Sequence, residues 1–349
     1  MTQDDERRRV RLRPVRGPII AGLVLVLGGL LFGGLVTGAP ASAARYQRLA
    51  SGHPATISVP TSITSGPDRS LWFTSLGGKD NPGSVDQITT GGKLTLYTGR
   101  GIDGPVGITV GPDGALWFTN SRGNSVGRIT TKGKVTTYTA RGIMDPIGIT
   151  SGPLGEVWFT NAYNPGSFGL ITTSGKITLR ASRDIDDPVG IVASPDGTVW
   201  VANAGTKTTK GSVAVLTTNG KITAYSGGGI DEPSGITVGP DKAIWFTNYS
   251  GNSIGRITSD GGGKIFTGKG IDAPFSITTG RDGALWFTNY SGNSIERITV
   301  DGKLTKFVGT GIDGPTGITS GPDGALWFTN SGNNSIGRIT TLGKVTNYT

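Results

Sequence analysis

Short runs of apolar and threonine residues recur along most of the chain, separated by glycine, proline, asparagine and aspartate. Residues 105–139 show the pattern well, because they contain four such runs of four to six residues. Gly111-Pro112-Asp113-Gly114, between the first two runs, is typical of a tight turn: proline presets φ, and glycine accepts a positive φ. Each unit of this kind therefore predicts four short strands joined by tight turns.

One tryptophan marks each unit. The seven tryptophans follow one another at intervals of 45, 41, 42, 45, 41 and 41 residues: Trp72, Trp117, Trp158, Trp200, Trp245, Trp286 and Trp327. Such a spacing is that of one four-stranded propeller blade. The second run of a unit is apolar on both faces, as expected for an inner strand covered by the blades on either side. The sequence predicts an all-β fold over residues 60–349: a seven-bladed β-propeller with four-stranded antiparallel blades, in which the tryptophans pack between blades.

The first 44 residues differ from the repeats. Residues 1–16 contain six arginines and three acidic residues, and the next 28 residues carry no charge. An apolar run followed by an Ala-x-Ala site at residues 41–43 is typical of a cleaved export signal. Residues 19–36 are also just long enough for an uncleaved membrane anchor. We therefore expect a signal or anchor helix in residues 1–44, a linker or edge strand over residues 45–59, and a secreted or membrane-anchored propeller.

Composition narrows the classes of function. The chain contains no cysteine, which excludes disulfides, thiolate metal sites and cysteine nucleophiles. The net charge is +9, and one lysine per unit occupies the turn before the fourth run: Lys93, Lys134, Lys176, Lys221, Lys264, Lys303 and Lys344. We expect this lysine ring at the lower outer edge, where it protects exposed strands or meets an anionic cell-surface polymer. Because no aromatic residues lie among the lysines, we expect no nucleic acid partner, and we expect a monomer.

The repeated unit carries a recognisable motif. It is Pro-x-Gly-Ile-Thr-x-Gly-Pro-Asp-Gly-Ala-Leu-Trp-Phe-Thr, followed by Gly-Asn-Ser-Ile-Gly-Arg-Ile-Thr and Gly-Lys-Val-Thr, and residues 105–120 and 315–330 show it best. This unit resembles the virginiamycin B lyase (streptogramin lyase) family. The resemblance implies a magnesium-assisted elimination that opens a cyclic depsipeptide antibiotic at its ester linkage. It also implies a catalytic histidine directly after the first-strand proline, and glutamates on the same rim, often directly after Trp-Phe-Thr.

The chain departs from both catalytic positions in every unit. The residues after the proline are Thr61, Val106, Ile147, Val189, Ser234, Phe275 and Thr316. The residues after the second run are Ser75, Asn120, Asn161, Asn203, Asn248, Asn289 and Asn330. The only histidine, His53, precedes the first unit. We therefore expect no catalytic residue and no cofactor. The alternative is a magnesium-dependent carbon–oxygen lyase in which Asp231 or Glu232 replaces the histidine as the base.

The upper rim, where second strands end and first strands begin, offers other candidates. Its asparagines either cap loops or contact a ligand. Only units five and six add tyrosines after the asparagine, and neighbouring blades would bring them beside a phenylalanine. The predicted contacts for a small molecule or peptide are Asn248, Tyr249, Phe275, Asn289, Tyr290, Asn120 and Asn330.

Acidic residues precede the first-strand proline in six units. They are Asp103, Asp186, Asp231, Asp272 and Asp313 two residues before it, and Asp145, Asp187 and Glu232 one residue before it. Such a cluster offers oxygen ligands for Ca²⁺ or Mg²⁺. The spacing matches no known metal loop, however, so the pattern favours aspartate-initiated turns, and no metal site is predicted.

Overall fold

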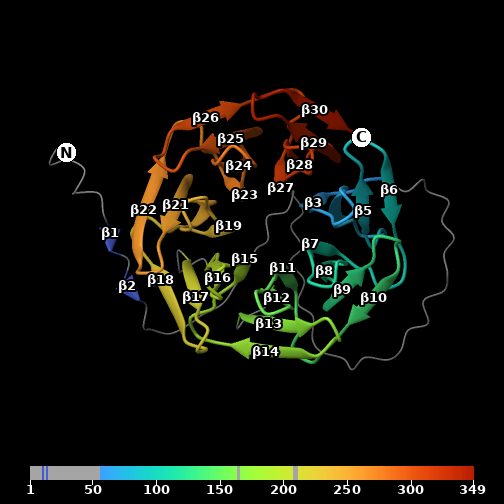
Figure 1. Ribbon diagram of the computed structural model, residues 1–349, viewed down its shortest axis with the longest axis horizontal. Coiled ribbons are helices and arrows are strands. Elements are labelled where there is room, and N and C mark those ends of the chain that lie inside the picture. Colours follow the sequence, from blue (N-terminus) through green and yellow to red (C-terminus); the bar gives the residue numbers. More distant parts are fainter. Residues whose placement is uncertain (1–9, 12, 15–55, 163–165, 207–210) are drawn as a thin grey trace.

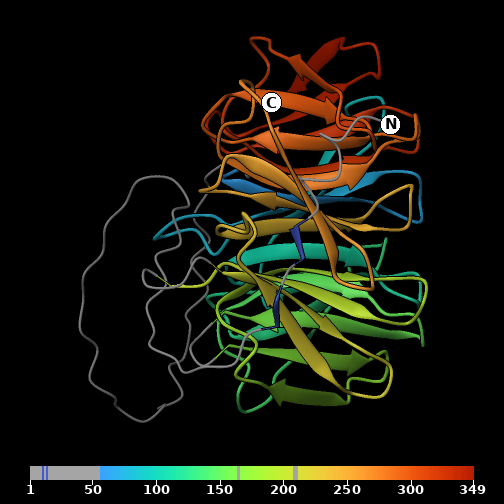
Figure 2. The same ribbon diagram turned by 90° about the vertical axis from the view of Figure 1, so that its left-hand side faces the viewer.

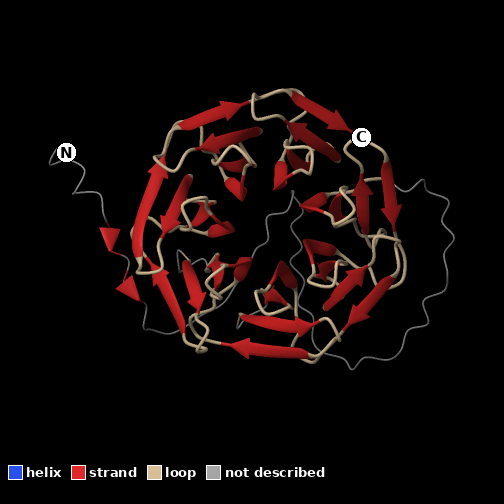
Figure 3. Cartoon of the chain, in the orientation of Figure 1, coloured by secondary structure: helices blue, strands red, loops and turns tan. Residues whose placement is uncertain are grey.

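Seven antiparallel sheets are arranged in a ring in the computed structural model of the protein (Figure 1). The residues that the structure describes are 10–11, 13–14, 56–162, 166–206 and 211–349. The predicted seven-bladed propeller with four-stranded antiparallel blades is confirmed, and strands and loops alone make up the ring in Figure 3. The search of these residues finds no helix with the length and apolarity to cross a membrane.

The strands of the first four blades follow one another in chain order. Blade 1 contains β3 (Pro60–Ser65), β4 (Leu71–Ser75), β5 (Ser84–Ile88) and β6 (Leu94–Tyr97). Blade 2 contains β7 (Pro105–Val110), β8 (Leu116–Asn120), β9 (Ser125–Ile129) and β10 (Val135–Tyr138). Blade 3 contains β11 (Pro146–Ser151), β12 (Glu156–Asn161), β13 (Ser167–Thr172) and β14 (Ile177–Ala181). Blade 4 contains β15 (Pro188–Ala193), β16 (Val199–Asn203), β17 (Ser212–Leu216) and β18 (Ile222–Ser226).

The last three blades continue the same order to the end of the chain. Blade 5 contains β19 (Pro233–Val238), β20 (Ile244–Asn248), β21 (Ser253–Ile257) and β22 (Gly262–Thr267). Blade 6 contains β23 (Pro274–Thr279), β24 (Leu285–Asn289), β25 (Ser294–Ile298) and β26 (Leu304–Phe307). Blade 7 contains β27 (Pro315–Ser320), β28 (Leu326–Asn330), β29 (Ser335–Ile339) and β30 (Val345–Tyr348).

Two short strands near the N-terminus add to the outer edge of the ring. β1 (Val10–Arg11) pairs with β22, and β2 (Arg13–Pro14) pairs with β18, so blades 4 and 5 each gain a fifth strand (Figure 2). The rest of the predicted signal or anchor helix of residues 1–44 lies outside the described residues. Of the predicted linker or edge strand over residues 45–59, residues 56–59 are described and form no strand.

The hydrophobic core is divided into seven clusters, and each cluster lies between two consecutive blades. The cluster between blades 1 and 2, for example, contains Trp72 from one blade and Leu116 and Phe118 from the next. Five tryptophans are fully buried: Trp72, Trp117, Trp245, Trp286 and Trp327. Each tryptophan also packs on an aromatic ring of its own blade, as in Trp117 with Tyr138 at 5.4 Å between ring centroids. The predicted packing role of the tryptophans is therefore confirmed.

Threonines near the end of the second strand link the blades at the channel. In blade 2, the pairing of β7 with β8 is irregular after Pro105. There Thr119 Oγ1 accepts a hydrogen bond from Gly107 N and donates one to the carbonyl of Ile147 in blade 3, at 2.7 Å. Equivalent threonines in the other blades are Thr74, Thr160, Thr247, Thr288 and Thr329. Blade 4 has Ala202 at this position, so this bond to blade 5 is missing.

The ring closes by direct packing of blade 7 on blade 1. Thr329 Oγ1 donates a hydrogen bond to the carbonyl of Thr61 at 2.8 Å, and Asn334 Oδ1 accepts one from Val59 N at 2.8 Å. Trp327 lies in one core cluster with Leu71 and Phe73 of blade 1. Because each of these two blades is built from its own four consecutive strands, the described residues exchange no strand across the closing interface.

Candidate ligand site on the upper rim

The entry loops bring their last residue to the rim in an unusual backbone conformation. The residue before the first-strand proline has a positive φ in every blade, at Val59, Gly104, Asp145, Asp187, Glu232, Ala273 and Gly314. An asparagine of the preceding blade supports this geometry in several blades, as when Asn124 Oδ1 accepts a hydrogen bond from Asp145 N at 2.8 Å. Left-handed backbone is costly for residues other than glycine, so contacts on both sides must hold it. Blades 3, 4 and 5 consequently place a carboxylate at equivalent points of the rim.

The rim asparagines are used to hold these loops. Asn248 Nδ2 donates to the carbonyl of Gly229 at 3.1 Å and to Ser253 Oγ at 2.9 Å, while its Oδ1 accepts from Asp231 N at 3.2 Å. Asn120, Asn289 and Asn330 make the same set of contacts. All four are at most 1% exposed. Their amides are therefore already engaged, which matches the loop-capping alternative, and the ligand contacts predicted for them stay a prediction.

Tyr249, Phe275 and Tyr290 lie together, as the repeat predicts. The Tyr249 and Phe275 ring centroids are 6.2 Å apart in an edge-to-face arrangement, and those of Phe275 and Tyr290 are 6.5 Å apart. All three side chains are half-buried. Burial raises the pKa of the Tyr249 hydroxyl, and Tyr290, Glu232 and Asp272 add to this through their negative charge. We call these three residues the aromatic patch. They form an apolar surface with polar groups at its border, which is a usual composition of a small-molecule site.

The three carboxylates beside this patch form a second group, which we call the acid arc: Asp145, Asp187 and Glu232. Asp187 lies in the middle and is only 6% exposed. Its pKa is raised to about 7, mainly by burial and in addition by the charges of Asp186, Asp145 and Glu232. Both Asp187 carboxylate oxygens lack a hydrogen-bond partner among the residues that the structure describes. By contrast, Asp145 accepts a hydrogen bond from Ser121 Oγ, and Glu232 accepts one from Ser250 Oγ.

The positions where the family resemblance places a catalytic histidine serve the contacts between blades. Thr61 Oγ1 donates to the carbonyl of Val106 at 3.0 Å, Ser234 Oγ to that of Phe275 at 2.9 Å, and Thr316 Oγ1 to that of Pro60 at 3.0 Å. The remaining four positions carry apolar side chains. None of these groups is a general base at neutral pH. The sole histidine of the sequence, His53, lies outside the described residues.

Two buried carboxylates inside blades 1 and 6 escaped the sequence reasoning. Asp86 and Glu296 occupy a third-strand position that is glycine in four blades: Gly127, Gly169, Gly255 and Gly337. Burial raises the pKa of Asp86 to about 7, although hydrogen bonds from Ser84 and Ser75 oppose this. Burial also raises the pKa of Glu296, with Lys306 and Asn289 opposing it. The sequence does indicate them, because these two units carry an acidic residue at a repeat position where four other units have glycine.

A metal centre does not form among the residues that the structure describes. The carboxylates of the entry loops are spread around the rim, and no group of three or more His, Asp or Glu side chains converges closely enough to hold an ion. Mg²⁺ requires near-octahedral oxygen ligands at about 2.1 Å, which needs a tighter arrangement. These residues therefore do not fit the magnesium ion that the resemblance implies.

The fold and this rim define a class of protein: a closed seven-bladed propeller with its candidate ligand surface at the channel mouth. The model of the virginiamycin B lyase family matches residues 47–227 and 179–349, so the chain belongs to this family. A streptogramin B lyase structure is 30% identical, with 80% of this chain and 92% of that one covered and a TM-score of 0.69. Selenomethionine-substituted virginiamycin B lyase from Staphylococcus aureus is 31% identical, with 81% and 95% covered and a TM-score of 0.70.

A third solved structure bears on the catalytic positions. It is a catalytically inactive histidine-to-alanine variant of virginiamycin B lyase from Staphylococcus aureus with quinupristin. It is 35% identical to this chain, and the match covers 72% of this chain and 86% of that one, with a TM-score of 0.66. No curated protein matches the chain.

Proposed function

We propose that this protein is an exported member of the virginiamycin B lyase family that binds a small molecule or peptide at the upper rim of blades 5 and 6 without lyase chemistry. The observation that carries the proposal is the aromatic patch at the mouth of the ring. It is present where the positions expected for the catalytic base hold only hydroxyl and apolar side chains. The chain therefore retains the fold of the family and also carries a surface suited to ligand binding.

The missing base is the main argument against elimination. Abstraction of an α-proton needs a group that accepts the proton at the working pH. One relative is catalytically inactive as a histidine-to-alanine variant, and no histidine occurs among the residues of this chain that the structure describes. Glu232, one of the two carboxylate alternatives beside Asp231, accepts a hydrogen bond from Ser250. Asp187 has a pKa of about 7 and lies on the same rim, but its side chain is buried, which limits its access to a substrate.

A direct assay for the lyase reaction tests this proposal. We expect that incubation of the purified protein with a streptogramin B and Mg²⁺ leaves the cyclic depsipeptide intact, because no base is in place. Mass spectrometry distinguishes the cyclic substrate from its linear product. An active lyase of the family serves as the positive control. Linear product formed at enzymatic rates would show that a carboxylate has taken over the role of the base, and the proposal would fail.

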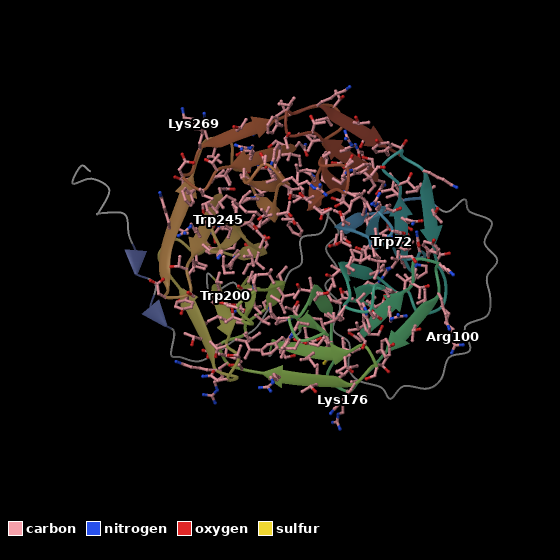
Figure 4. All side chains as sticks on the ribbon, viewed as in Figure 1. Trp72, Arg100, Lys176, Trp200, Trp245 and Lys269 are labelled. Atoms are coloured by element: carbon pink, nitrogen blue, oxygen red, sulfur yellow. The ribbon has the colours of Figure 1, made fainter. Side chains whose placement is uncertain are left out.

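The lysine ring supports a second candidate, attachment to an anionic cell-surface polymer. All seven lysines are exposed; six lie in the turn before the fourth strand, whereas Lys264 lies within β22, and Figure 4 shows Lys176 pointing away from the ring. We expect retention on a polyphosphate-bearing column to fall at least about tenfold between roughly 0.05 and 0.5 M salt, because salt screens exposed charges. Changing Lys134, Lys176 and Lys221 to glutamine should weaken retention, whereas the same change at Lys242 on another turn should not. Retention that ignores both salt and the triple variant would contradict this candidate.

A further inference from the structure

The top of blade 4 holds buried acceptors that the fold leaves unused. Within the described part of the chain, both oxygens of Asp187 lack a donor, and so does Oδ1 of Asn203, which is fully buried. The two residues are neighbours across the sheet, since Asn203 pairs with Pro188 and Ala204 N donates to the carbonyl of Asp187 at 2.9 Å. Buried polar groups in folded proteins nearly always have partners, so a buried carboxylate with none indicates a missing donor.

Negative charge is concentrated at this point of the rim. Asp145 lies on the entry loop of blade 3, and Glu232 lies on the entry loop of blade 5. The charges of Asp186, Asp145 and Glu232 all raise the pKa of Asp187. When all three are ionised, above the raised pKa of Asp187, these carboxylates at equivalent positions of consecutive blades repel one another, and a positive charge between them would relieve the repulsion. A cation that donates hydrogen bonds would remove the repulsion and also satisfy the acceptors.

The acid arc is continuous with the aromatic patch. Tyr249 N donates a hydrogen bond to the carbonyl of Glu232 at 3.0 Å. The negative charges of Glu232 and Asp272 contribute to the raised pKa of the Tyr249 hydroxyl. A ligand on the rim would therefore meet carboxylates on one side and ring faces and edges on the other. Aromatic rings attract cations as well as apolar groups, so the two surfaces favour the same kind of molecule.

We infer that the upper rim of blades 3 to 6 binds an organic cation, with an ammonium or guanidinium group against the acid arc and an apolar ring against the aromatic patch. The carboxylates are too widely spread for a metal ion, since no metal-type cluster forms among the described residues. A multi-donor organic group of larger radius can reach several of them at once. This inference rests on the proposed ligand-binding function and names the chemical class of its ligand.

Paired probes test the inference. Phenethylammonium and 2-phenylethanol share one ring and differ in charge, so titration of the full-length protein with each at pH 8, followed by ligand-detected NMR, separates ring binding from charge recognition. We expect the ammonium to bind at least about tenfold more tightly than the alcohol. Asp187→Asn should reduce this ratio to about twofold and leave alcohol binding unchanged. Glu232→Gln, which changes a less buried carboxylate, should give an intermediate ratio.

Control variants distinguish recognition of the positive charge from binding to the aromatic patch. Asp313→Asn changes an entry-loop carboxylate of blade 7, outside the arc, and should leave the ratio unchanged. Tyr249→Ala should weaken both probes. Equal binding of both probes, or displacement of the ammonium by millimolar Mg²⁺ through a shared site, would overturn the organic-cation assignment and leave aromatic-patch binding standing. Failure of both probes to bind the parent protein would overturn the inference and the rim binding proposed above.

Discussion

Trp327→Ala is expected to lower the free energy of unfolding by about 3–5 kcal/mol, the usual range for truncating a large buried aromatic side chain. Trp327 is fully buried, stacks on Tyr348 at 5.3 Å between centroids, and donates from Nε1 to Asp323 at 3.0 Å. Its removal leaves a cavity between blades 7 and 1, the interface that closes the ring. Urea unfolding, followed by circular dichroism, measures the change.

Two comparison variants make this result specific. Trp117→Ala creates an equivalent cavity between blades 2 and 3 and should cost a similar amount, because the closing interface has the same construction as the others. Leu342→Ala changes an exposed side chain of blade 7 and should have almost no effect. A loss below about 1 kcal/mol for Trp327→Ala would contradict the view that closure depends on this packing.

The fold could be predicted from the sequence because its signal is repeated seven times. Trp117, its turn aspartate Asp113 and the threonine Thr119 each have counterparts in most units, so local noise cancels and the period sets the number of blades. The proximity of Tyr249 to Phe275 could also be predicted, since a repeat places equivalent positions of neighbouring blades side by side. These are consequences of chain periodicity alone.

Side-chain direction was harder to predict. The sequence shows an acidic residue before the proline in blades 3 to 5, but it does not show that Asp187 is buried while Asp145 and Glu232 accept hydrogen bonds from serines. It likewise leaves open whether a rim asparagine faces a ligand or its own loop, and Asn248 turns toward the loop. The burial of Asp187 and the direction of Asn248 both depend on the left-handed backbone of the entry-loop residues. The periodic pattern of the sequence does not reveal this backbone conformation.

The candidate ligand surface lies where blades 3 to 6 depart from the repeat. Blade 4 lacks the threonine link to blade 5, because Ala202 replaces the threonine. It also carries Asp187, whose carboxylate accepts no hydrogen bond from the residues that the structure describes. Blades 5 and 6 carry the aromatic patch. Symmetry of the ring supplies a rigid scaffold, and the asymmetric residues of blades 3 to 6 supply a candidate surface on one side of the channel mouth.

Asp86→Asn is expected to stabilise the protein at pH 8 by roughly 2–4 kcal/mol and to have little effect near pH 4. Burial raises the pKa of Asp86 to about 7 in the folded state, from 3.8 for the free side chain. Between these values the folded state holds a proton that the unfolded state has lost, so stability falls as pH rises from about 4 to about 7. Above pH 7 both states are ionised, and the cost of burying the charge is complete. Asparagine keeps the size of the side chain and can still accept from Ser75 and Ser84, but it carries no charge.

The measurement is the denaturation midpoint of parent and variant at intervals from pH 4 to pH 8. We expect the two curves to converge at low pH and to separate with rising pH, with the variant above. Asp80→Asn, on an exposed turn, should follow the parent across the range. Asp187→Asn should separate from the parent with the same sign, since the pKa of Asp187 is also raised to about 7. A variant of Asp86 that is less stable than the parent at pH 8 would show that the carboxylate has a partner that burial and hydrogen bonding do not account for.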